Sequence, residues 1–321
     1  MNVQRLERIP DNGSFFYFRG CFINNFYPGI ESATRFVLEK LGVKYVVSDD
    51  QTCCGTPEFS SLNADTVLTC LVGRNASIIL EKTPYVITDC NGCYSSFYVA
   101  EALMEDPQIK FQTDKILKKI GKKFEKVEVI HIADFFYKKM SEILKNVAFS
   151  LGELRMAVHY GCHYSHVDGE KGLDSVENPS FLEEMVEKLG GIPVEYTEKT
   201  LCCGFGGIQQ TVHKTISYAV TQKKIDSLSE AYAEAIVVIC PYCLNVLDKY
   251  QGNLLDVEML EKPIPVIHLS QLLALLMGAE PRKLGFQMHR IPVEPIIAKL
   301  APKDTQTPRL DFQSFSQKVY G

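Results

Sequence analysis

Short apolar runs alternate with longer amphipathic segments along most of the chain. Runs rich in β-branched and aromatic residues, at 15–21, 85–90 and 236–240, have the length and composition of buried strands. Between them, residues 30–41 carry apolar side chains at helical spacing, and Gly42 follows where such a helix is expected to end. This alternation predicts an α/β fold in which βα units build mostly parallel sheets flanked by helices.

The same pattern occurs twice. The run FFYFRGC at 15–21 matches MAVHYGC at 156–162, and the other strand-like runs recur in the same order. A repeat of this length indicates two pseudo-symmetric halves. We therefore expect halves at residues 1–150 and 151–300, followed by a polar tail at 301–321.

A further helix is expected shortly after the boundary between the halves, which we place in the mixed stretch 148–153. Residues 181–189 carry an apolar stripe, and Ser180 stands three residues before Glu183. A serine followed three residues later by a glutamate is the pattern of an N-terminal capping box. The sequence therefore predicts that Ser180 and Glu183 cap this helix.

The chain has eleven cysteines, and ten of them form two sets with the same internal order. Each set has a single cysteine, an adjacent pair and a Cys-x-x-Cys unit. The intervals are 31 and 35 residues in the first set, and 39 and 36 in the second. The first set is Cys21, Cys53, Cys54, Cys90 and Cys93, and the second is Cys162, Cys202, Cys203, Cys240 and Cys243.

These cysteines follow the expected carboxyl ends of strands, which form the edge where open α/β sheets bind ligands. Each Cys-x-x-Cys unit also precedes a helical pattern. Its thiols are then near a helix N-terminus, where the helix dipole favours thiolates and negatively charged clusters. We therefore expect one site in each half, at the carboxyl edge of its sheet.

Composition excludes several functional classes. The 321 residues are 46% hydrophobic and 23% charged, which is typical of a globular enzyme. A net charge of −5 gives no basic surface for nucleic acid, and no apolar run approaches the roughly 20 residues of a membrane span. The amino terminus has no export signal, so a cytoplasmic location is expected. Because disulfides are rare in the cytosol, so many cysteines indicate metal binding or redox chemistry.

Five thiols per half fit a polynuclear metal site better than a single ion. Structural zinc uses four ligands in a tetrahedron, which would leave one thiol unused in each half. Adjacent cysteines do not easily direct both thiolates at one small ion, whereas they can bind different irons of a cluster. The sequence therefore favours an extended iron–sulfur centre.

This cysteine pattern resembles the CCG-domain signature of the B subunit of heterodisulfide reductase. The resemblance extends over about residues 14–300 and includes motifs besides the cysteine spacing. The supporting segments are residues 27–31, 90–93, 159–163, 202–204 and 289–291.

The resemblance implies a redox function with defined cofactors and partners. Each set of five cysteines would bind one non-cubane [4Fe-4S] cluster, and a disulfide would be reduced by two electrons between the two clusters. The substrate of that family is the mixed disulfide of coenzyme M and coenzyme B, in methanogenesis. Electrons reach it through the heterodisulfide reductase C subunit, which carries cubane iron–sulfur clusters, from the A subunit, which carries flavin. Hydrogenase or formate dehydrogenase modules and flavin-based electron bifurcation belong to the same family context.

Two features depart from the family pattern. Glu58 follows the first cysteine pair, where an acidic side chain would be unfavourable beside an anionic coenzyme. The tail contains Phe312, Phe315 and Tyr320 and is expected to be an arm that docks on a partner. Both features are consistent with a bacterial or divergent relative that acts on another disulfide.

The histidines offer further candidates. His163 and His166 follow Cys162 and are candidates for proton donation to a leaving thiolate, or for hydrogen bonds to cluster sulfur. His131 and His268 stand at matching strand ends and are expected to cap helices or to form local hydrogen bonds. The eleventh cysteine, Cys70, lies on an apolar helical stripe and is expected to be a small buried hydrophobic residue.

Three functions remain open on these residues. The first is the reduction of a disulfide within a larger enzyme complex. The second is electron transfer by a CCG protein of a fumarate reductase, a succinate dehydrogenase or a similar complex. The third is a structural zinc protein, which would contain zinc but no acid-labile sulfide.

Overall fold

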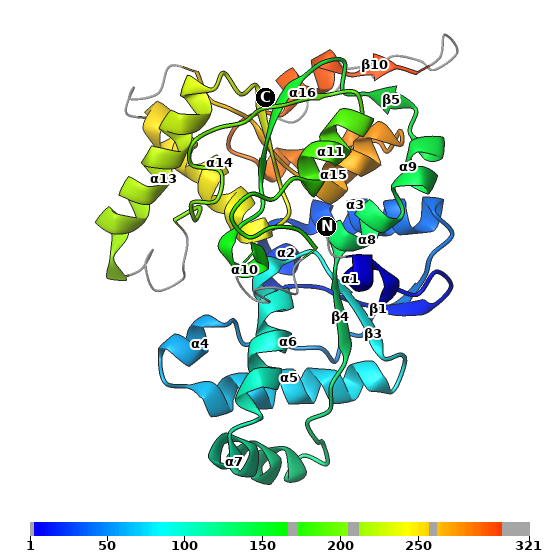
Figure 1. The fold of residues 1–321 in the computed structure, drawn as a ribbon, viewed down its shortest axis with the longest axis vertical. Helices are drawn as coiled ribbons and strands as arrows, with labels where there is room; N and C mark the ends of the chain where they lie inside the picture. Colours follow the sequence, from blue (N-terminus) through cyan, green and yellow to red (C-terminus); the bar gives the residue numbers. More distant parts are fainter. Residues whose placement is uncertain (1–2, 166–172, 205–211, 257–261, 304–321) are drawn as a thin grey trace.

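The computed structural model describes residues 3–165, 173–204, 212–256 and 262–303 (Figure 1). Two parallel four-stranded sheets share one strand order, β2-β1-β3-β4 in the first half and β7-β6-β8-β9 in the second. The strands of the first sheet are β1 (Ser14–Phe18), β2 (Lys44–Val46), β3 (Tyr85–Thr88) and β4 (Glu128–His131). Those of the second are β6 (Arg155–His159), β7 (Ile192–Pro193), β8 (Ala235–Val238) and β9 (Val266–His268). The predicted duplicated α/β fold is confirmed.

Helices follow the strands in both halves. The first half contains α1 (Val3–Glu7), α2 (Cys21–Phe26), α3 (Pro28–Lys40), α4 (Glu58–Ser61), α5 (Asp65–Leu80), α6 (Asn91–Leu103), α7 (Pro107–Lys118), α8 (Ile132–Lys138) and α9 (Met140–Asn146). The second contains α10 (Cys162–Ser165), α11 (Phe181–Lys188), α13 (Lys214–Glu230), α14 (Pro241–Asp256), α15 (Leu269–Leu276), η2 (Pro281–Leu284), η3 (Phe286–Met288) and α16 (Glu294–Lys299). A short antiparallel pair joins β5 (Phe149–Ser150) to β10 (Ala301–Pro302).

The strand-like runs form the centres of the two sheets. In β1 the side chains from Phe15 to Phe18 are all buried, and in β8 the whole strand is buried. Strands that are buried on both faces are typical of parallel sheets covered by helices. The helix predicted at 30–41 is α3, and Gly42 follows it with a φ of +67°. Glycine adopts this left-handed conformation without steric cost, which explains why the helix ends there.

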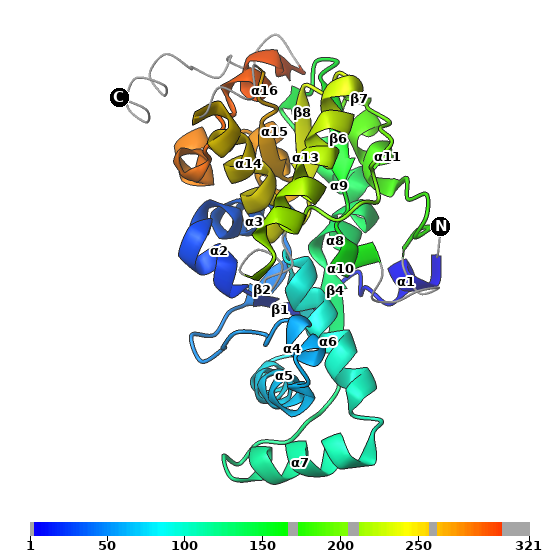
Figure 2. The same ribbon diagram turned by 90° about the vertical axis from the view of Figure 1, so that its left-hand side faces the viewer.

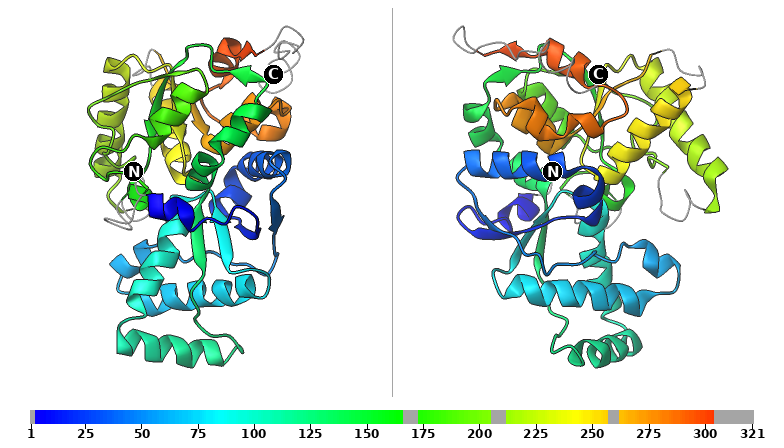
Figure 3. Two further views of the ribbon diagram at one scale, coloured as in Figure 1. Left: turned by 45° about the vertical axis from the view of Figure 1, so that its right-hand side comes forward. Right: turned by 180° about the vertical axis from the view of Figure 1, so that it is seen from behind.

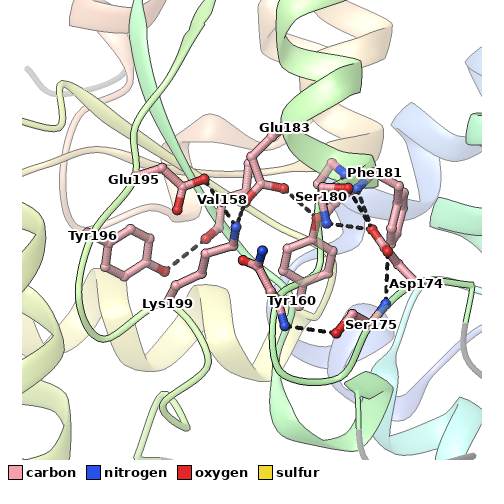
Figure 4. Close-up of polar contacts among 12 residues, drawn as sticks. Val158, Tyr160, Asp174, Ser175, Ser180, Phe181, Glu183, Glu195, Tyr196 and Lys199 are labelled. Carbon is pink, nitrogen blue, oxygen red and sulfur yellow. Dashed lines mark hydrogen bonds and ion pairs between the residues drawn. The ribbon is translucent and has the colours of Figure 1, made fainter. Parts of the chain in front are cut away.

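The predicted capping box at Ser180 and Glu183 is wrong. Ser180 is the N-cap of α11, but its side chain makes no capping hydrogen bond. Instead the Asp174 carboxylate accepts from the amides of Ser180 and Phe181 (Figure 4). Glu183 turns away from the helix end, accepts a hydrogen bond from Tyr160 and pairs with the buried Lys199. A carboxylate six residues upstream therefore replaces the local cap, because the glutamate is bound in the interior.

The two histidines at the strand ends are helix caps, as predicted. His131 Nδ1 accepts from the Ala133 amide at 3.2 Å, and His268 Nδ1 accepts from the Ser270 amide at the same distance. The ring of His268 also reaches the first half, where its Nε2 lies 3.2 Å from the carbonyl oxygen of Asp89. This histidine therefore links the two halves next to the first Cys-x-x-Cys unit.

The halves pack against each other in a reciprocal way. Helix α3 of the first half packs along α15 of the second, α2 packs on α14, and α10 packs on α6 (Figures 2 and 3). Each helix that begins at a single cysteine thus lies beside the helix that the Cys-x-x-Cys unit of the other half opens. This arrangement brings the carboxyl edges of the two sheets together.

Some predictions lie outside the described residues. These are the candidate His166 and the docking arm with Phe312, Phe315 and Tyr320. The division into domains near residue 150 stays a prediction. Within the part of the chain that the structure describes, no helix combines the length and apolar character needed to cross a membrane.

Candidate metal centre

Four of the predicted ligand cysteines lie shortly after the carboxyl ends of strands, at the starts of helices. Cys21 is the first residue of α2 and follows β1, and Cys162 stands at the same place in α10 after β6. Cys90 is the N-cap of α6, and Cys240 directly precedes α14. The predictions that the thiols gather at the carboxyl edges and that each Cys-x-x-Cys unit opens a helix are confirmed. Helix N-termini at these positions favour negative charge on the thiols.

Each single cysteine contacts the first member of the adjacent pair. The Sγ atoms of Cys21 and Cys53 are 3.8 Å apart, and those of Cys162 and Cys202 are 3.7 Å apart. The structure thus brings together thiols that are 32 and 40 positions apart in the sequence. The same geometry in both halves indicates two sites of one kind.

The remaining thiols complete the two groups. Cys54 lies within hydrogen-bonding reach of Cys93, and Cys203 lies within reach of Cys243. All four are buried. Every cysteine that the sequence predicts as a ligand is therefore close to others of its own set.

The two groups also meet each other. The thiols of Cys90 and Cys240, one from each half, lie within hydrogen-bonding reach. The side-chain amide of Asn91 donates to the carbonyl oxygen of Tyr160 across the same junction, at 2.7 Å. The two thiol groups are therefore fixed relative to each other by backbone and side-chain contacts.

The first member of each adjacent cysteine pair is strongly acidic. The pKa of Cys53 is lowered to about 2 because the thiols of Cys21 and Cys54 and the backbone amide of Gly55 donate hydrogen bonds to its sulfur. The pKa of Cys202 is lowered to about 2 by the same kind of thiol and amide donors. The amide nitrogen of Gly55 lies 3.4 Å from Sγ of Cys53, and that of Gly204 lies 3.4 Å from Sγ of Cys202. Both environments favour the thiolate, which is the form that binds metal.

The glycine after each cysteine pair is required by the turn. Gly55 and Gly204 have φ angles of +91° and +92°, which other residues rarely adopt. A Cβ atom at Gly204 would also lie 2.5 Å from Oγ1 of Thr221. Glycine therefore lets the backbone pass close to α13 while its amide points at the cysteine sulfur.

A cavity of about 210 Å³ lies at the second set, between the two halves. All five cysteines of that set line it, and residues of the first half reach over it from 56–62 and from the start of α6. The predicted His163 lines this cavity, as does Glu58. The lining residues are Thr56, Glu58, Phe59, Leu62, Asn91, Gly92, Cys162, His163, Cys202, Cys203, Cys240, Tyr242 and Cys243.

Sequence reasoning missed one residue beside these thiols. His159 is buried, and its ring lies with the sulfurs of Cys203 and Cys243 in a group whose ligand atoms are all within 4.8 Å of one another. The match of MAVHYGC to FFYFRGC contains the signal, because a histidine stands where the first half has Phe18. The structure was needed to show that this histidine is buried and that its ring nitrogens have no partner among the described residues.

The described residues fit an iron–sulfur group in each half. Ten thiols converge in two sets, and several buried polar atoms near them have no hydrogen-bond partner among the described residues, namely both ring nitrogens of His159, Asn91 Oδ1 and Ser95 Oγ. Buried polar atoms are normally paired, so these atoms indicate a missing partner. Cys70 lies apart on α5, where it is half-buried next to Thr113 and burial raises its pKa.

Comparisons with known proteins agree with this geometry. The cysteine-rich CCG domain matches the chain twice, at residues 15–98 and 156–248. The B subunit of a ferredoxin/F420H2-dependent CoB-CoM heterodisulfide reductase of Methanosarcina acetivorans is 37% identical, with 88% of this chain and 95% of that protein covered. The membrane anchor of an 8-methylmenaquinol:fumarate reductase of Wolinella succinogenes is 26% identical, with 84% of this chain and 94% of that protein covered.

A solved structure shares the fold alone. It is described as a hypothetical protein from Helicobacter pylori, with a TM-score of 0.64 and 12% sequence identity. The match covers 89% of this chain and 53% of that chain. Taken with the duplicated cysteine sets, the comparisons show that the chain belongs to the CCG cysteine-rich domain family as a relative of the heterodisulfide reductase B subunit.

Proposed function

We propose that this chain is the catalytic subunit of a heterodisulfide reductase and that it holds two non-cubane [4Fe-4S] clusters. The observation that supports this most is the convergence of two five-thiol sets on one junction, where Cys90 lies beside Cys240. The proposed ligands of the first cluster are Cys21, Cys53, Cys54, Cys90 and Cys93. Those of the second are Cys162, Cys202, Cys203, Cys240 and Cys243.

Two one-electron sites suit the reduction of a disulfide, which takes up two electrons. When bound, the clusters would supply those electrons and iron that accepts thiolate sulfur. The chain's own residues hold this arrangement. The amides of Gly55 and Gly204 stabilise negative charge at the sites, and the Asn91 side chain keeps the two halves in register.

The cavity at the second set is the proposed substrate position. Its wall combines thiols with apolar side chains, including Phe59, Leu62 and Tyr242, which exclude water from the sulfur atoms. His163 lies in this wall and is proposed to give a proton to the departing thiolate, a role that histidine commonly performs. His166 is kept as a second candidate for this role.

The substrate of the family is the disulfide of coenzymes M and B, and we propose it as the first substrate to test. Glu58 adds a carboxylate to the cavity, and one of its oxygens has no hydrogen-bond partner among the described residues. This acidic group disfavours an anionic substrate at that point, so disulfides with neutral or cationic ends are the next to test.

We further propose that the chain works in the cytoplasm with two partners of the same enzyme, the cubane-cluster C subunit and the flavin-containing A subunit. Such complexes can include hydrogenase or formate dehydrogenase modules. The match to a heterodisulfide reductase B subunit over 95% of its length supports this assembly. Electron transfer within a fumarate reductase complex is the second candidate function, because the Wolinella relative is named as part of such an enzyme.

Turnover separates these two candidates. Anaerobically prepared chain with full iron and sulfide would be given reduced viologen and the disulfide of coenzymes M and B, and free thiols would be counted. We expect two thiols per disulfide consumed. If a fully iron-loaded chain forms no thiol from this disulfide or from neutral and cationic ones, the reductase function is refuted and electron transfer becomes the function to test.

A further inference from the structure

The two sheets place different side chains at one equivalent position. Phe18 ends β1 and is paired in register with Thr88 of β3, and His159 ends β6 and is paired with Val238 of β8. Both stand three residues before the single cysteine of their set. Sequence repeat and strand register therefore agree that His159 is the counterpart of Phe18.

The surroundings of these two residues differ. Phe18 is 0% exposed and packs edge-on against Phe97, with the ring centroids 5.5 Å apart. His159 is 1% exposed, yet neither ring nitrogen has a hydrogen-bond partner among the described residues. A neutral imidazole has one N–H donor and one acceptor nitrogen, so a buried ring needs a partner for each. The phenyl ring has no polar atom that needs a partner, whereas the imidazole has two nitrogens without one among the described residues.

The group that His159 faces is a set of sulfurs. Its ring lies in the group with Cys203 and Cys243, whose ligand atoms are all within 4.8 Å of one another. Both cysteines belong to the second proposed cluster. Sulfur atoms of an iron–sulfur cluster and its thiolate ligands accept hydrogen bonds, and such bonds are among the factors that set the reduction potential.

A buried cation strengthens the difference. Lys224 on α13 is fully buried, and its Nζ donates to the carbonyl oxygen of Lys199 at 3.3 Å. Its charge interacts with the thiols of Cys203 and Cys243. Helix α5 is the counterpart of α13 in the first half, and Arg74 stands as many residues before its end as Lys224 stands before the end of α13. Arg74 instead donates to the carbonyl oxygen of Asp50 at the surface. The second site therefore has a donor and a cation where the first has a phenyl ring and an outward arginine.

We propose that His159 donates a hydrogen bond to sulfur at the second cluster and that this cluster therefore has a higher reduction potential than the first. Reduction adds negative charge to a cluster, and an N–H donor stabilises that charge, so the reduced state is favoured at the second site. This inference rests on the proposed function, because it requires both clusters. Electrons that enter the chain collect at the cluster next to the cavity, where His163 also lies.

Exchange of the two residues tests the proposal. Wild type, H159F, H159Q and F18H would be prepared with full iron and sulfide, and the midpoint potential of each cluster measured by electron paramagnetic resonance during a redox titration. We expect two unequal potentials in wild type. H159F lowers the higher one, H159Q keeps most of it because the amide still donates, and F18H raises the lower one. H213F, at an exposed position, leaves both unchanged.

Other outcomes overturn the proposal. Unchanged potentials in both H159F and F18H, at full iron content, would show that this position does not set the difference. Strong nitrogen coupling in the magnetic resonance spectra would show that His159 binds iron and is a ligand instead of a donor. If H159F does not take up iron, F18H decides the question, because its first site keeps all five cysteines. Absence of clusters from wild type would refute the proposed function itself and is distinguished by the iron and sulfide content.

Discussion

The two halves share a scaffold and differ in the side chains around it. Strand order, cysteine order and the acidic thiols at Cys53 and Cys202 are the same in both. The residues next to the single cysteine differ, since Phe18 and Phe22 of the first half stand where the second has His159 and His163. Duplication thus supplied two equivalent thiol sets, and the residues beside the single cysteines are apolar in the first half and polar in the second.

Directly before the Cys-x-x-Cys units the contrast is reversed, and the first half is the polar one. Before Cys90 the first half has the buried carboxyl group of Asp89, which accepts from the Tyr17 hydroxyl at 2.6 Å, and burial raises its pKa. The second half has Ile239 at this position. Elsewhere in the second half, the buried Glu183 pairs with Lys199 and accepts a hydrogen bond from Tyr160 (Figure 4). Among the described residues, the cavity lies on the side of the second half, which supports that half as the substrate side.

Removal of one thiol from each set gives the largest expected effect. Cys53→Ser and Cys202→Ser should each lose about half of the iron, because each would abolish one cluster and leave the other. Both should lose disulfide cleavage, since each electron needs its own site. Iron and sulfide assays with viologen-dependent turnover measure this, and Cys70→Ser is the control. Full iron content in either set variant would exclude that cysteine as a ligand.

The next effect concerns the histidine that only the second half carries beside its single cysteine. His163→Gln should lower the rate of disulfide cleavage by about 100-fold or more, because general acid catalysis contributes that much. The cluster content should stay the same. Phe22→His is the matched variant in the first half, and it should leave the rate within a few-fold of wild type. A full rate in His163→Gln would remove this residue from the mechanism.

The glycines after the cysteine pairs should differ in stability cost. Gly55→Ala should cost about 1–2 kcal/mol for the left-handed backbone. Gly204→Ala should cost more, about 3 kcal/mol or above, because its Cβ would also lie 2.6 Å from the carbonyl oxygen of Ser217. Denaturant unfolding measures both, with Gly121→Ala as the control for backbone strain alone. Equal costs at Gly55 and Gly204 would contradict the contact with α13.

A smaller effect distinguishes the halves by pH. Burial raises the pKa of Asp248 in α14 to about 6, whereas the same position of α6 is Tyr98. Because the folded pKa exceeds the ordinary value of 3.8, the stability contribution falls as pH rises from about 4 to about 6 and is constant above. The loss should be about 2–3 kcal/mol. Unfolding measured against pH should show a steeper fall in stability in wild type than in Asp248→Asn. Equal slopes would assign the titration to other groups.

Much of this arrangement could be predicted from the sequence. The repeated order of the cysteines indicates two sites, and strand-like runs before them place the thiols at sheet edges. The roles of His131 and His268 also follow from position, since both end a strand directly before a helical pattern. Local pattern is sufficient in these cases because the contacts are made by neighbours in the chain.

The remainder depends on contacts between distant residues. The cap at Ser180 is replaced by Asp174 because Glu183 is bound by Lys199, which no local motif reveals. The packing of α3 on α15 and the reach of residues 56–62 over the second set also need the assembled fold. His159 became a candidate only when burial showed both ring nitrogens without partners among the described residues.

The metal content of the chain tests the central claim most directly. Anaerobically purified protein would be assayed for iron, acid-labile sulfide and zinc, and spectra of the oxidised protein recorded with and without coenzyme M. The two-cluster arrangement predicts about eight irons per chain with matching sulfide, and a paramagnetic signal that appears when the thiol binds. Zinc without acid-labile sulfide would contradict it.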